Sequence, residues 1–542
     1  MSNDASLKNI SNGEDYDVVV AGAGFAGMYA VYVALQRGLS VLCIEKASDV
    51  GGTWYWNRYP GARCDVESIY YSYSFDEDLQ REWRWSERYA TQPEILAYAQ
   101  HVADRFDLRR HIRFEENVVN ASFSDDTARW RIETDRAREI YARFMILTLG
   151  NLSTPLKPGF KDLDQFKGEV YYTAEWPKSD VDVSGKRVAL IGGGSSGNKA
   201  APHLAEKASQ LTVFQRTPNF SVPIKNMDLS DSDWADVQAK YSEIRNAART
   251  SFGGTRHEPH STPYHEATEK DRQAAFERGW TNGGVLYATV FEDQLLDQDV
   301  NDAAAAFAAK KVREIVKDPR TADDLIPTDH PIGAKRICTD NGYFSMFNRE
   351  NVDLVNLRKD PIVGFFESGV ETKSTRHEFD VVVIATGFDA MTGSVLRLDL
   401  NGPRGERMQD TWSDGPVTLL GVGVPGFPNL FNIMGPGSPS VLANGIMGAE
   451  QQVDWVYDLI QYTDDKSYTM VEARKDAAAA WTGFVTAIAN HTLFVKGKTW
   501  YTGANVEGKP RVFMAYVGGL GPYAQYCSDI RDADYKGFIF SA

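Results

Sequence analysis

The sequence predicts an α/β fold with two dinucleotide-binding, Rossmann-like domains and a helical insertion. Two segments carry this prediction. Each begins with a short β-branched run, passes through three closely spaced glycines and enters a helix-forming stretch, starting at Tyr16 and at Lys186. Short apolar runs of this kind are typical of buried parallel strands. A polar stretch rich in helix formers, near 225–330, indicates the insertion.

The chain is long and acidic. It has 542 residues, of which 43% are hydrophobic and 24% charged, and its net charge is -16. The length predicts two or more domains. Nucleic acids and anionic membranes attract clustered Lys and Arg, so the acidic balance disfavours both as partners. Apolar runs stay short of the roughly 20 residues that span a bilayer. The polar start, 1–17, lacks the features of a signal peptide, so we expect a cytoplasmic protein.

The cysteines and histidines do not predict a metal site. The four cysteines are far apart and form no CxxC pair: Cys43, Cys64, Cys338 and Cys527. This disfavours a disulfide framework, a zinc site and a dithiol reductase. His257, His260 and His265 lie in a loop rich in Gly, Pro and Ser, without helical or strand spacing. A solvated loop is therefore favoured over a metal site.

The first glycine segment has the pattern of a dinucleotide site. Gly22, Gly24 and Gly27 form GxGxxG after an apolar strand, and the helical run that follows reaches Gln36. Such glycines permit a tight turn, close approach to a pyrophosphate and close packing of helix on strand, while the helix N-terminus favours phosphate charge. Glu45 follows a second β run about 20 residues onward, where a ribose-binding acid is expected.

The second glycine segment differs at the ribose position. Its glycines are Gly192, Gly194 and Gly197, and Ser195 and Ser196 lie between them. The next strand ends in Gln215-Arg216-Thr217, with no acid. Because an arginine there can bind a 2′-phosphate that an acid would repel, NADPH is favoured over NADH. The alternative is that Arg216 is only a solvated charge at a strand end.

Two further apolar runs end in glycine, at 144–150 and 379–387, and predict crossings between domains. In two-dinucleotide flavoproteins such runs carry the chain between domains, so the resemblance to them implies an FAD-binding domain from 1–150 and 388–542. The NADPH-binding domain then comprises 151–387 and contains the insertion at about 225–330. Within the insertion, Asn301 and the alanines after it predict a capped helix that Pro319 ends. Two unlike nucleotide sites suggest that NADPH reduces a bound flavin, which performs the next step.

Long motifs outside the glycine loops resemble those of type I Baeyer–Villiger monooxygenases. GGTWYWNRYPGARCD at 51–65 and FKGEVYYTAEWP at 166–177 resemble two family fingerprints. GPGSPS at 435–440 and WYTGAN at 500–505 look like the phenylacetone and steroid monooxygenase branch. The resemblance covers nearly the whole chain. One departure is Tyr172, where the fingerprint usually has a histidine. A tyrosine cannot carry positive charge near neutral pH, which bears on how well NADPH use is coupled to oxygenation.

This resemblance implies an FAD-dependent, NADPH-using enzyme that converts ketones to esters or lactones with O2 through a C4a-peroxyflavin, and that can also oxidise sulfides. Its partners are O2 and a small ketone, with no obligatory protein partner. Arg336 matches the catalytic arginine, and Asp65 the carboxylate that orients it. Lys335 joins Arg216 and Thr217 around the 2′-phosphate.

The resemblance also assigns the remaining site residues. Trp500 matches an aromatic wall beside the nicotinamide, and a short loop matches the lining of the substrate pocket: Ser440, Val441 and Leu442. Flavin contacts are assigned to Thr53, Trp54, Asp65, Tyr71, Val118 and Gly445.

Three alternatives stay open from the sequence. A flavin-containing monooxygenase that oxidises nitrogen or sulfur shares the two-site plan. An NADPH-dependent flavoprotein reductase and a non-enzymatic flavin sensor are further possibilities. The 51–65 motif and the Trp176-Pro177 pair favour the Baeyer–Villiger reaction.

Overall fold

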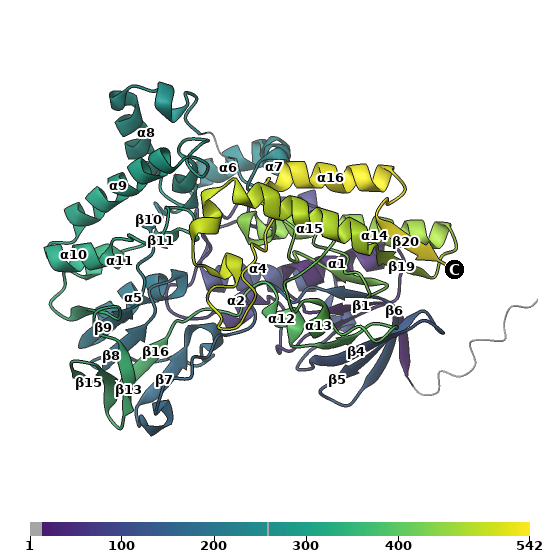
Figure 1. Ribbon diagram of the computed structural model, residues 1–542, viewed down its shortest axis with the longest axis horizontal. Coiled ribbons are helices and arrows are strands. Elements are labelled where there is room, and N and C mark those ends of the chain that lie inside the picture. Colours follow the sequence, from purple (N-terminus) through teal and green to yellow (C-terminus); the bar gives the residue numbers. More distant parts are fainter. Residues whose placement is uncertain (1–12, 257–258) are drawn as a thin grey trace, which may run out of the picture.

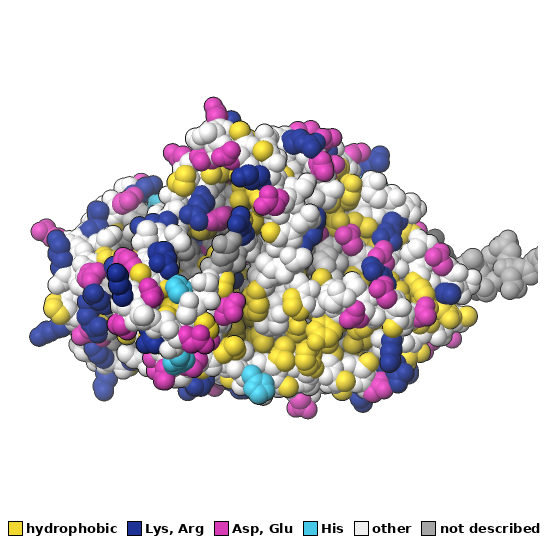
Figure 2. Space-filling model, turned by 90° about the horizontal axis from the view of Figure 1, so that it is seen from above, with side chains coloured by type: hydrophobic (Ala, Val, Ile, Leu, Met, Phe, Trp, Pro, Cys, Tyr) yellow, Lys and Arg dark blue, Asp and Glu magenta, His cyan; other side chains and the backbone are white. Residues whose placement is uncertain are grey.

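The structure is a computed structural model that describes residues 13–256 and 259–542. Two sheets lie side by side, and most of the longer helices lie above them in the view of Figure 1. The face seen from above mixes side chains of both charge signs and carries an apolar area near its middle (Figure 2). On this face the acidic excess therefore does not form one continuous patch.

The first sheet has eight strands around the first glycine loop. In spatial order they are β17 (Asp399–Asn401), β4 (Val118–Ser124), β5 (Arg129–Thr134), β6 (Glu139–Leu147), β1 (Glu14–Ala21), β2 (Val41–Ile44) and β3 (Ile112–Arg113), with β18 (Leu430–Asn432) also on β6. β1 pairs in parallel with β2 and β6, whereas β5 is antiparallel to β4 and β6. The helix after the loop, α1, spans Phe25–Gln36, as predicted.

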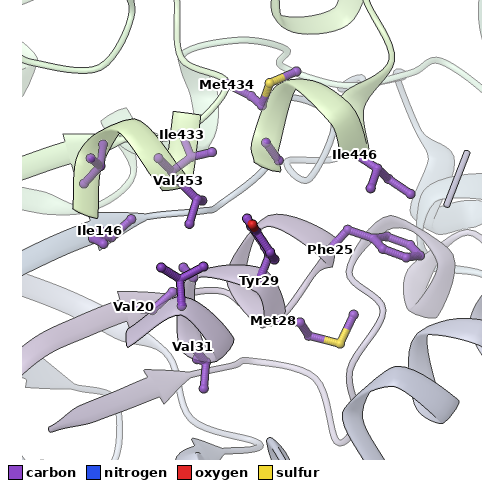
Figure 3. Close-up of a cluster of buried hydrophobic side chains, with 14 of the residues drawn as sticks. Val20, Phe25, Met28, Tyr29, Val31, Ile146, Ile433, Met434, Ile446 and Val453 are labelled. Carbon is purple, nitrogen blue, oxygen red and sulfur yellow. The ribbon is translucent and has the colours of Figure 1, made fainter. Parts of the chain in front are cut away.

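The two ends of the chain share the core of this sheet. Helix α14 (Gly445–Asp465) packs on α1, and β18 pairs with β6. Figure 3 shows the result: Met28 and Val20 from the first segment lie in one apolar cluster with Ile433 and Val453. Burial of these side chains ties segments more than 400 residues apart into a single layer of packing.

The second sheet is wholly parallel. Its order is β12 (Val352–Asn356), β9 (Gln210–Gln215), β8 (Arg187–Ile191), β16 (Val381–Ile384) and β7 (Glu169–Tyr172). Helix α5 (Ser195–Lys207) follows the second glycine loop. The predicted α/β fold with two glycine-loop units is therefore confirmed.

Two segments cross together between the sheets. They follow β6 and β16, the strands that end in the two apolar-to-glycine steps. Leu156 donates its backbone N–H to the Gly387 oxygen at 2.9 Å, and Asp389 donates to the Thr154 oxygen at 2.9 Å. The two crossing segments are thus hydrogen-bonded to each other, and we call this pair of segments the crossing strap. The residue limits of the two domains stay a prediction.

Helices occupy much of the stretch expected to be an insertion: α6 (Asp231–Ala239), α7 (Tyr241–Thr250), α8 (Glu269–Asn282), α9 (Gln298–Ile315) and α10 (Pro319–Leu325). The predicted limits of α9 are wrong. Asp297 caps it, since its carboxylate accepts from the N–H groups of Asp299 and Val300. Asn301 is buried inside the helix. Pro319 begins α10 instead of ending α9, because the first helical position needs no N–H donor.

The remaining elements are mostly short. They are α2 (Thr53–Trp56), α3 (Glu77–Glu82), α4 (Gln92–Arg105), β10 (Ser221–Pro223), β11 (Cys338–Asp340), α11 (Tyr343–Met346), β13 (Ile362–Phe366), β14 (Gly369–Thr372), β15 (Arg376–Glu378), α12 (Gly393–Leu396), α13 (Met408–Thr411), β19 (Met470–Ala473), α15 (Lys475–Asn490), α16 (Leu520–Asp532) and β20 (Phe538–Ser541). No helix within 13–256 or 259–542 is both long and apolar enough to cross a membrane.

The histidine loop can be followed only in part, because His257 lies outside the described residues. His260 Nδ1 is 3.0 Å from the Thr262 oxygen, and His265 Nε2 is 3.1 Å from an Asp297 oxygen. Across the described chain, no three His, Cys, Asp or Glu side chains are grouped so as to hold a metal ion. The four cysteines are buried and free.

Candidate active site

The first glycine loop is shaped by contacts that a side chain would destroy. A Cβ on Gly27 would lie 1.8 Å from the Gly22 carbonyl oxygen, and Gly22 itself has φ +105°. Gly24 precedes α1 and offers no side-chain cap to the helix. Its neighbour across the loop is Gly52, where a Cβ would lie 2.9 Å from the Gly24 Cα. The N–H groups at the start of α1 are therefore free, and the glycines beside them have no side chains. Together they form a cradle of backbone atoms that can bind a pyrophosphate.

Glu45 lies at the edge of this cradle. It directly follows β2, is buried, and accepts hydrogen bonds from the N–H groups of Ala23 and Ala47, both at 2.6 Å. Burial raises the pKa of its carboxyl group, although the two hydrogen bonds oppose this. Each carboxylate oxygen has a further lone pair for a ribose hydroxyl. Glu116 donates its backbone N–H to the Glu45 backbone carbonyl oxygen at 3.1 Å, which brings the start of β4 and Val118 alongside.

Three of the other expected flavin contacts, Thr53, Trp54 and Tyr71, lie together. Trp54, on α2, donates its indole N–H to the Tyr71 hydroxyl at 3.1 Å, and the two rings are 5.8 Å apart, edge to face. Thr53 starts the same short helix. The Val118 side chain instead packs in the core on the opposite face of the first sheet. It can therefore offer a cofactor only its backbone.

The second glycine loop repeats this design. Gly192 has φ +121°, and a Cβ on Gly197 would lie 2.0 Å from the Gly192 oxygen. By contrast, nothing lies within 4 Å of the Cβ position of Gly194, which precedes α5. Ser195 and Ser196 are the first residues of that helix. The open side of this loop is suited to a second dinucleotide phosphate.

The residues expected around a 2′-phosphate converge beside this loop. Arg216 is exposed just after β9, and Thr217 follows it. Burial lowers the pKa of Lys335, and the nearby cations Arg358 and Arg216 lower it further, whereas Asp329 opposes them. Sequence reasoning missed Arg358, which donates to the Thr217 hydroxyl at 3.1 Å. The sequence did contain a signal for it: β12 is the parallel neighbour of β9, and Arg358 is a cation two residues beyond the end of β12.

We expect Arg216→Ala to reduce the preference for NADPH over NADH. Loss of one charge-assisted contact should lower kcat/KM for NADPH by about tenfold to a hundredfold, because the 2′-phosphate is the only difference between the cofactors. The value for NADH should change little. Comparing kcat/KM for both cofactors provides the measurement. Equal effects on NADPH and NADH would show that Arg216 does not recognise the 2′-phosphate.

Arg336 and Asp65 form a two-pronged ion pair between distant segments. Arg336 Nε and Nη2 each lie 3.0 Å from a different Asp65 oxygen, and Nη1 donates to the Val441 carbonyl at 3.0 Å. Burial disfavours a charged Asp65, but Arg336 and Lys199 outweigh it and lower the pKa of the carboxyl group. Burial likewise opposes the charge of Arg336, yet Asp65 raises its pKa overall. The pair therefore stays ionised.

The 51–65 motif reaches this pair by crossing from one glycine loop to the other. Its start faces the first loop at Gly52, whereas a Cβ on Gly61 would lie 2.4 Å from the Lys199 oxygen of α5. Tyr59 is buried in the core of the second sheet. Burial raises its pKa to about 12, although a hydrogen bond to Ser196 lowers it. The motif is long because it must contact both nucleotide units.

Two more residues at this pair were not anticipated. Tyr501 is 1% exposed and hydrogen-bonds to Arg336; burial raises its pKa to about 12. Its ring centre is 4.3 Å from that of Trp500, the expected aromatic wall. Lys199 is buried, and its ammonium donates to the Arg63 carbonyl at 2.7 Å. Tyr501 follows Trp500 within WYTGAN, and Lys199 lies about one turn after Ser196, so both were within reach of sequence reasoning.

The predicted pocket loop lies against the same group. Ser440 has φ +48°, and its hydroxyl accepts from the Asn151 amide at 2.9 Å. Val441 and Leu442 pack partly buried in one apolar cluster with Trp500. Since the Val441 carbonyl accepts from Arg336, the loop and the ion pair are directly joined.

Tyr172 lies where the second sheet meets the crossing strap. It ends β7, opposite Ile384 of β16, and the Lys157 ammonium is 5.3 Å from the centre of its ring. Phe166 and Trp176, the intact fingerprint residues, are buried in cores on the two faces of this sheet. A tyrosine here attracts the Lys157 cation, whereas a protonated histidine would repel it.

We therefore expect Tyr172→His to change the ratio of ester formed to NADPH consumed, without changing the product. Residues at a domain crossing affect how motion follows cofactor binding rather than the reaction itself. The measurement is NADPH consumed, hydrogen peroxide released and ester formed. Tyr172→Phe keeps the ring facing Lys157 and serves as the control. An unchanged ratio in Tyr172→His would mean that neighbouring residues have adapted to the tyrosine.

Comparison with known proteins agrees with this geometry. The family model described as "Flavin-binding monooxygenase-like" matches residues 15–225. The chain is 41% identical to a Baeyer-Villiger monooxygenase of Pseudooceanicola batsensis, over 97% of this chain and 96% of that protein. A structure of oxidized steroid monooxygenase bound to NADP superposes with a TM-score of 0.94 at 49% identity, covering 97% of this chain and 99% of that one. The OTEMO complex with FAD and NADP gives a TM-score of 0.94 at 36% identity, covering 98% and 100%.

The fold and the two nucleotide loops define a flavoprotein that takes electrons from NADPH. The chain belongs to the Baeyer–Villiger monooxygenase family. It is an FAD-binding, NADPH-dependent monooxygenase of ketones, which confirms the family, the fold class and both cofactors predicted from the sequence.

Proposed function

We propose that Arg336 is the catalytic cation for oxygen insertion beside a ketone carbonyl, and that Asp65 orients it. The observation that carries this proposal is the two-pronged Arg336–Asp65 pair, joined to the Val441 loop on one side and to Tyr501 on the other. These contacts fix the orientation of the Arg336 guanidinium group. A preorganised charge of this kind stabilises negative charge that develops on a substrate oxygen.

The chain's own residues supply binding and electrostatics for this reaction. Bound FAD and NADPH supply O2 activation and electrons. Gly22, Gly24, Gly27 and Glu45 would hold FAD, and the second loop with Arg216, Thr217 and Lys335 would hold NADPH. Arg336 stays charged at every working pH, so it can stabilise an oxyanion without itself losing a proton. The apolar side chains around Val441 and Trp500 exclude water beside it.

A product screen tests the reaction. The purified yellow protein is given NADPH, O2 and a panel of linear, aromatic, cyclic and steroidal ketones, together with a thioether and an aromatic amine. We expect ketone-dependent NADPH loss with formation of esters or lactones, and some sulfoxide. Turnover of only the thioether or amine would favour the nitrogen- or sulfur-oxidising alternative. NADPH oxidation with hydrogen peroxide as the sole product would favour a reductase.

Gly445 is proposed to leave room for bulky ketones. It is the first residue of α14, and nothing lies within 4 Å of its Cβ position, so packing does not demand a glycine. The helix is capped instead by Asn444, whose side chain accepts from the N–H groups of Ile446 and Met447. The open space at Gly445 lies three residues beyond the Val441–Leu442 loop.

We expect Gly445→Met to fill this space and narrow the substrate range. Activity on steroidal or aryl ketones should fall by at least about tenfold relative to small linear ketones, since overpacking a pocket costs roughly 1–3 kcal/mol. The measurement is kcat/KM across the panel, and Gly445→Ala is the control because it adds one methyl group to open space. An unchanged range in Gly445→Met would mean that the glycine only serves the turn.

We also propose that 1–150 with 388–542 binds FAD, that 151–387 binds NADPH, and that the enzyme works in the cytoplasm without an obligatory protein partner. Four buried free cysteines fit a reducing compartment. The pairing of β17 and β18 with strands of the first sheet supports the discontinuous domain. Cell fractionation and activity of the purified chain alone test the location and the partner.

A further inference from the structure

Arg358 lies at the edge of the second nucleotide site, beside residues that sequence reasoning had assigned to it. It comes two residues after β12, and its neighbour Leu357 donates a backbone N–H to the Gln215 backbone carbonyl oxygen at 2.9 Å. That bond continues the parallel pairing of β12 with β9 past the strand ends. Arg358 is therefore placed next to Arg216 and Thr217 by the register of the sheet.

The side chain of Arg358 is aimed by two contacts. Its Nη2 donates to the Thr217 hydroxyl at 3.1 Å and also pairs with an Asp329 carboxylate oxygen. Within the described chain, Nε and Nη1 carry no hydrogen bond, so their N–H groups remain available as donors. A charged N–H donor of this kind forms a strong hydrogen bond to a phosphate oxygen.

Asp329 holds Arg358 without neutralising the site. Its other oxygen is 2.6 Å from His330 Nδ1. Burial raises the pKa of Asp329, but hydrogen bonds to His330 and Arg358 outweigh it and lower the pKa to about 2. Burial lowers the pKa of His330, although the hydrogen bond to Asp329 raises it. Lys335 interacts with Arg216, Arg358 and Asp329, so three cations and one acid lie at this site. A phosphate monoester, with a charge of about -1.5 to -2 near neutral pH, matches the surplus.

We propose that Arg358 is a further recognition residue for the 2′-phosphate of NADPH, held beside Thr217 by Asp329, and that it adds to the choice of NADPH over NADH. This inference rests on the proposed placement of the phosphate at Arg216, Thr217 and Lys335. It assigns specificity to the end of β12, a segment outside every motif in the sequence. The guanidinium adds free N–H donors and a third cation to the hydroxyl and two cations already assigned there.

The test uses the purified holoenzyme and calorimetric binding of 2′,5′-ADP, with 5′-AMP as the probe that lacks the 2′-phosphate. Arg358→Met should weaken 2′,5′-ADP about fivefold to tenfold, less than a buried charge pair because the side chain is 42% exposed. Binding of 5′-AMP should not change. Arg358→Lys, which keeps the charge but not the planar group held by Thr217 and Asp329, should fall between the wild type and Arg358→Met.

The adjacent Lys359 provides a matched control. It is 70% exposed and pairs with Asp324, away from Thr217. Lys359→Met removes the same charge and should leave 2′,5′-ADP binding within about twofold of the wild type, because exposed charges are strongly screened. If both variants weakened 2′,5′-ADP binding equally, the effect would come from the overall positive charge of this surface. That result would overturn a specific role for Arg358.

Anaerobic reduction of the flavin gives a second readout that needs no ketone. Arg358→Met should raise the NADPH concentration for half-maximal reduction while the limiting rate and the NADH dependence stay close to wild type. If Arg216→Ala weakens 2′,5′-ADP but Arg358→Met does not, the inference about Arg358 is wrong and the assigned phosphate site stands. If neither variant weakens it, the phosphate binds elsewhere and both assignments fall.

Discussion

Replacing Arg336 by methionine is expected to abolish ester formation while the purified protein remains yellow. The variant keeps the first glycine loop and Glu45, so FAD should stay bound. It loses the fixed charge proposed to face the reacting oxygen. Removing one such preorganised donor lowers kcat by about a hundredfold to a thousandfold in enzymes that stabilise an oxyanion. Flavin content by absorbance and ester by chromatography measure the two effects.

Because Arg336 is paired with Asp65, the experiment needs a control for the loss of this ion pair. Arg336→Met leaves Asp65 without its main counter-charge, and an unpaired, partly buried carboxylate destabilises the fold. The double variant Arg336→Met/Asp65→Asn removes both charges and should restore the melting temperature without restoring the ester. Arg313→Met, which breaks an exposed pair between Arg313 on α9 and Asp323 on α10, controls for loss of any arginine. Ester formation by Arg336→Met at the wild-type rate would rule out a catalytic role.

Replacing Gly27 by alanine is expected to give a colourless protein. The added methyl carbon would lie 1.8 Å from the Gly22 carbonyl oxygen and 2.9 Å from the Thr148 hydroxyl. The first of these is backbone at the end of β1, so relief requires moving α1 away from the strand. That movement separates the free N–H groups of α1 from the cradle that a pyrophosphate needs. We expect FAD affinity to fall by more than about a hundredfold, equivalent to roughly 3 kcal/mol of strain and lost contacts.

Flavin absorbance relative to protein, before and after adding excess FAD, measures this effect. Gly483→Ala is the matched control, because Gly483 lies within α15 and nothing is within 4 Å of its Cβ position. That change should leave the flavin content unaltered and stabilise the helix slightly. A fully yellow Gly27→Ala protein with wild-type affinity would show that the close packing of α1 on β1 is not needed for binding.

Local patterns were sufficient for the two nucleotide units. GxGxxG after a β-branched run specifies a strand, a tight turn and a helix because the contacts involved span only a few residues, as between Gly22 and Gly27. The limits of α1 and β2 followed from the same local signals. The limits of α9 did not. Asn301 and Asp297 are both capable caps, and burial of the Asn301 amide against the Gln294 and Ile332 carbonyls selected Asp297.

Only those site residues that match motifs of the family could be predicted from the sequence. Asp65 and Arg336 could be paired through the resemblance to the family, and the structure places them in direct contact. Their further partners, Tyr501 and Lys199, are 165 and 137 positions from Arg336 along the chain. No local periodicity links such distant positions. Only the packing of α5 and of the 500–505 segment around the ion pair brings them there.

By itself the sequence determined that this protein has two glycine-loop units, an acid after the first and an arginine after the second, because these features depend on short-range backbone geometry and charge. The tertiary structure alone decided that Arg358 joins Thr217, that Tyr501 meets Arg336 and that Gly445 faces open space. Each of these depends on strand register or on the packing of segments far apart in the chain. A shift of β12 by one residue along β9 would turn Arg358 to the other face of the sheet while leaving every sequence motif unchanged.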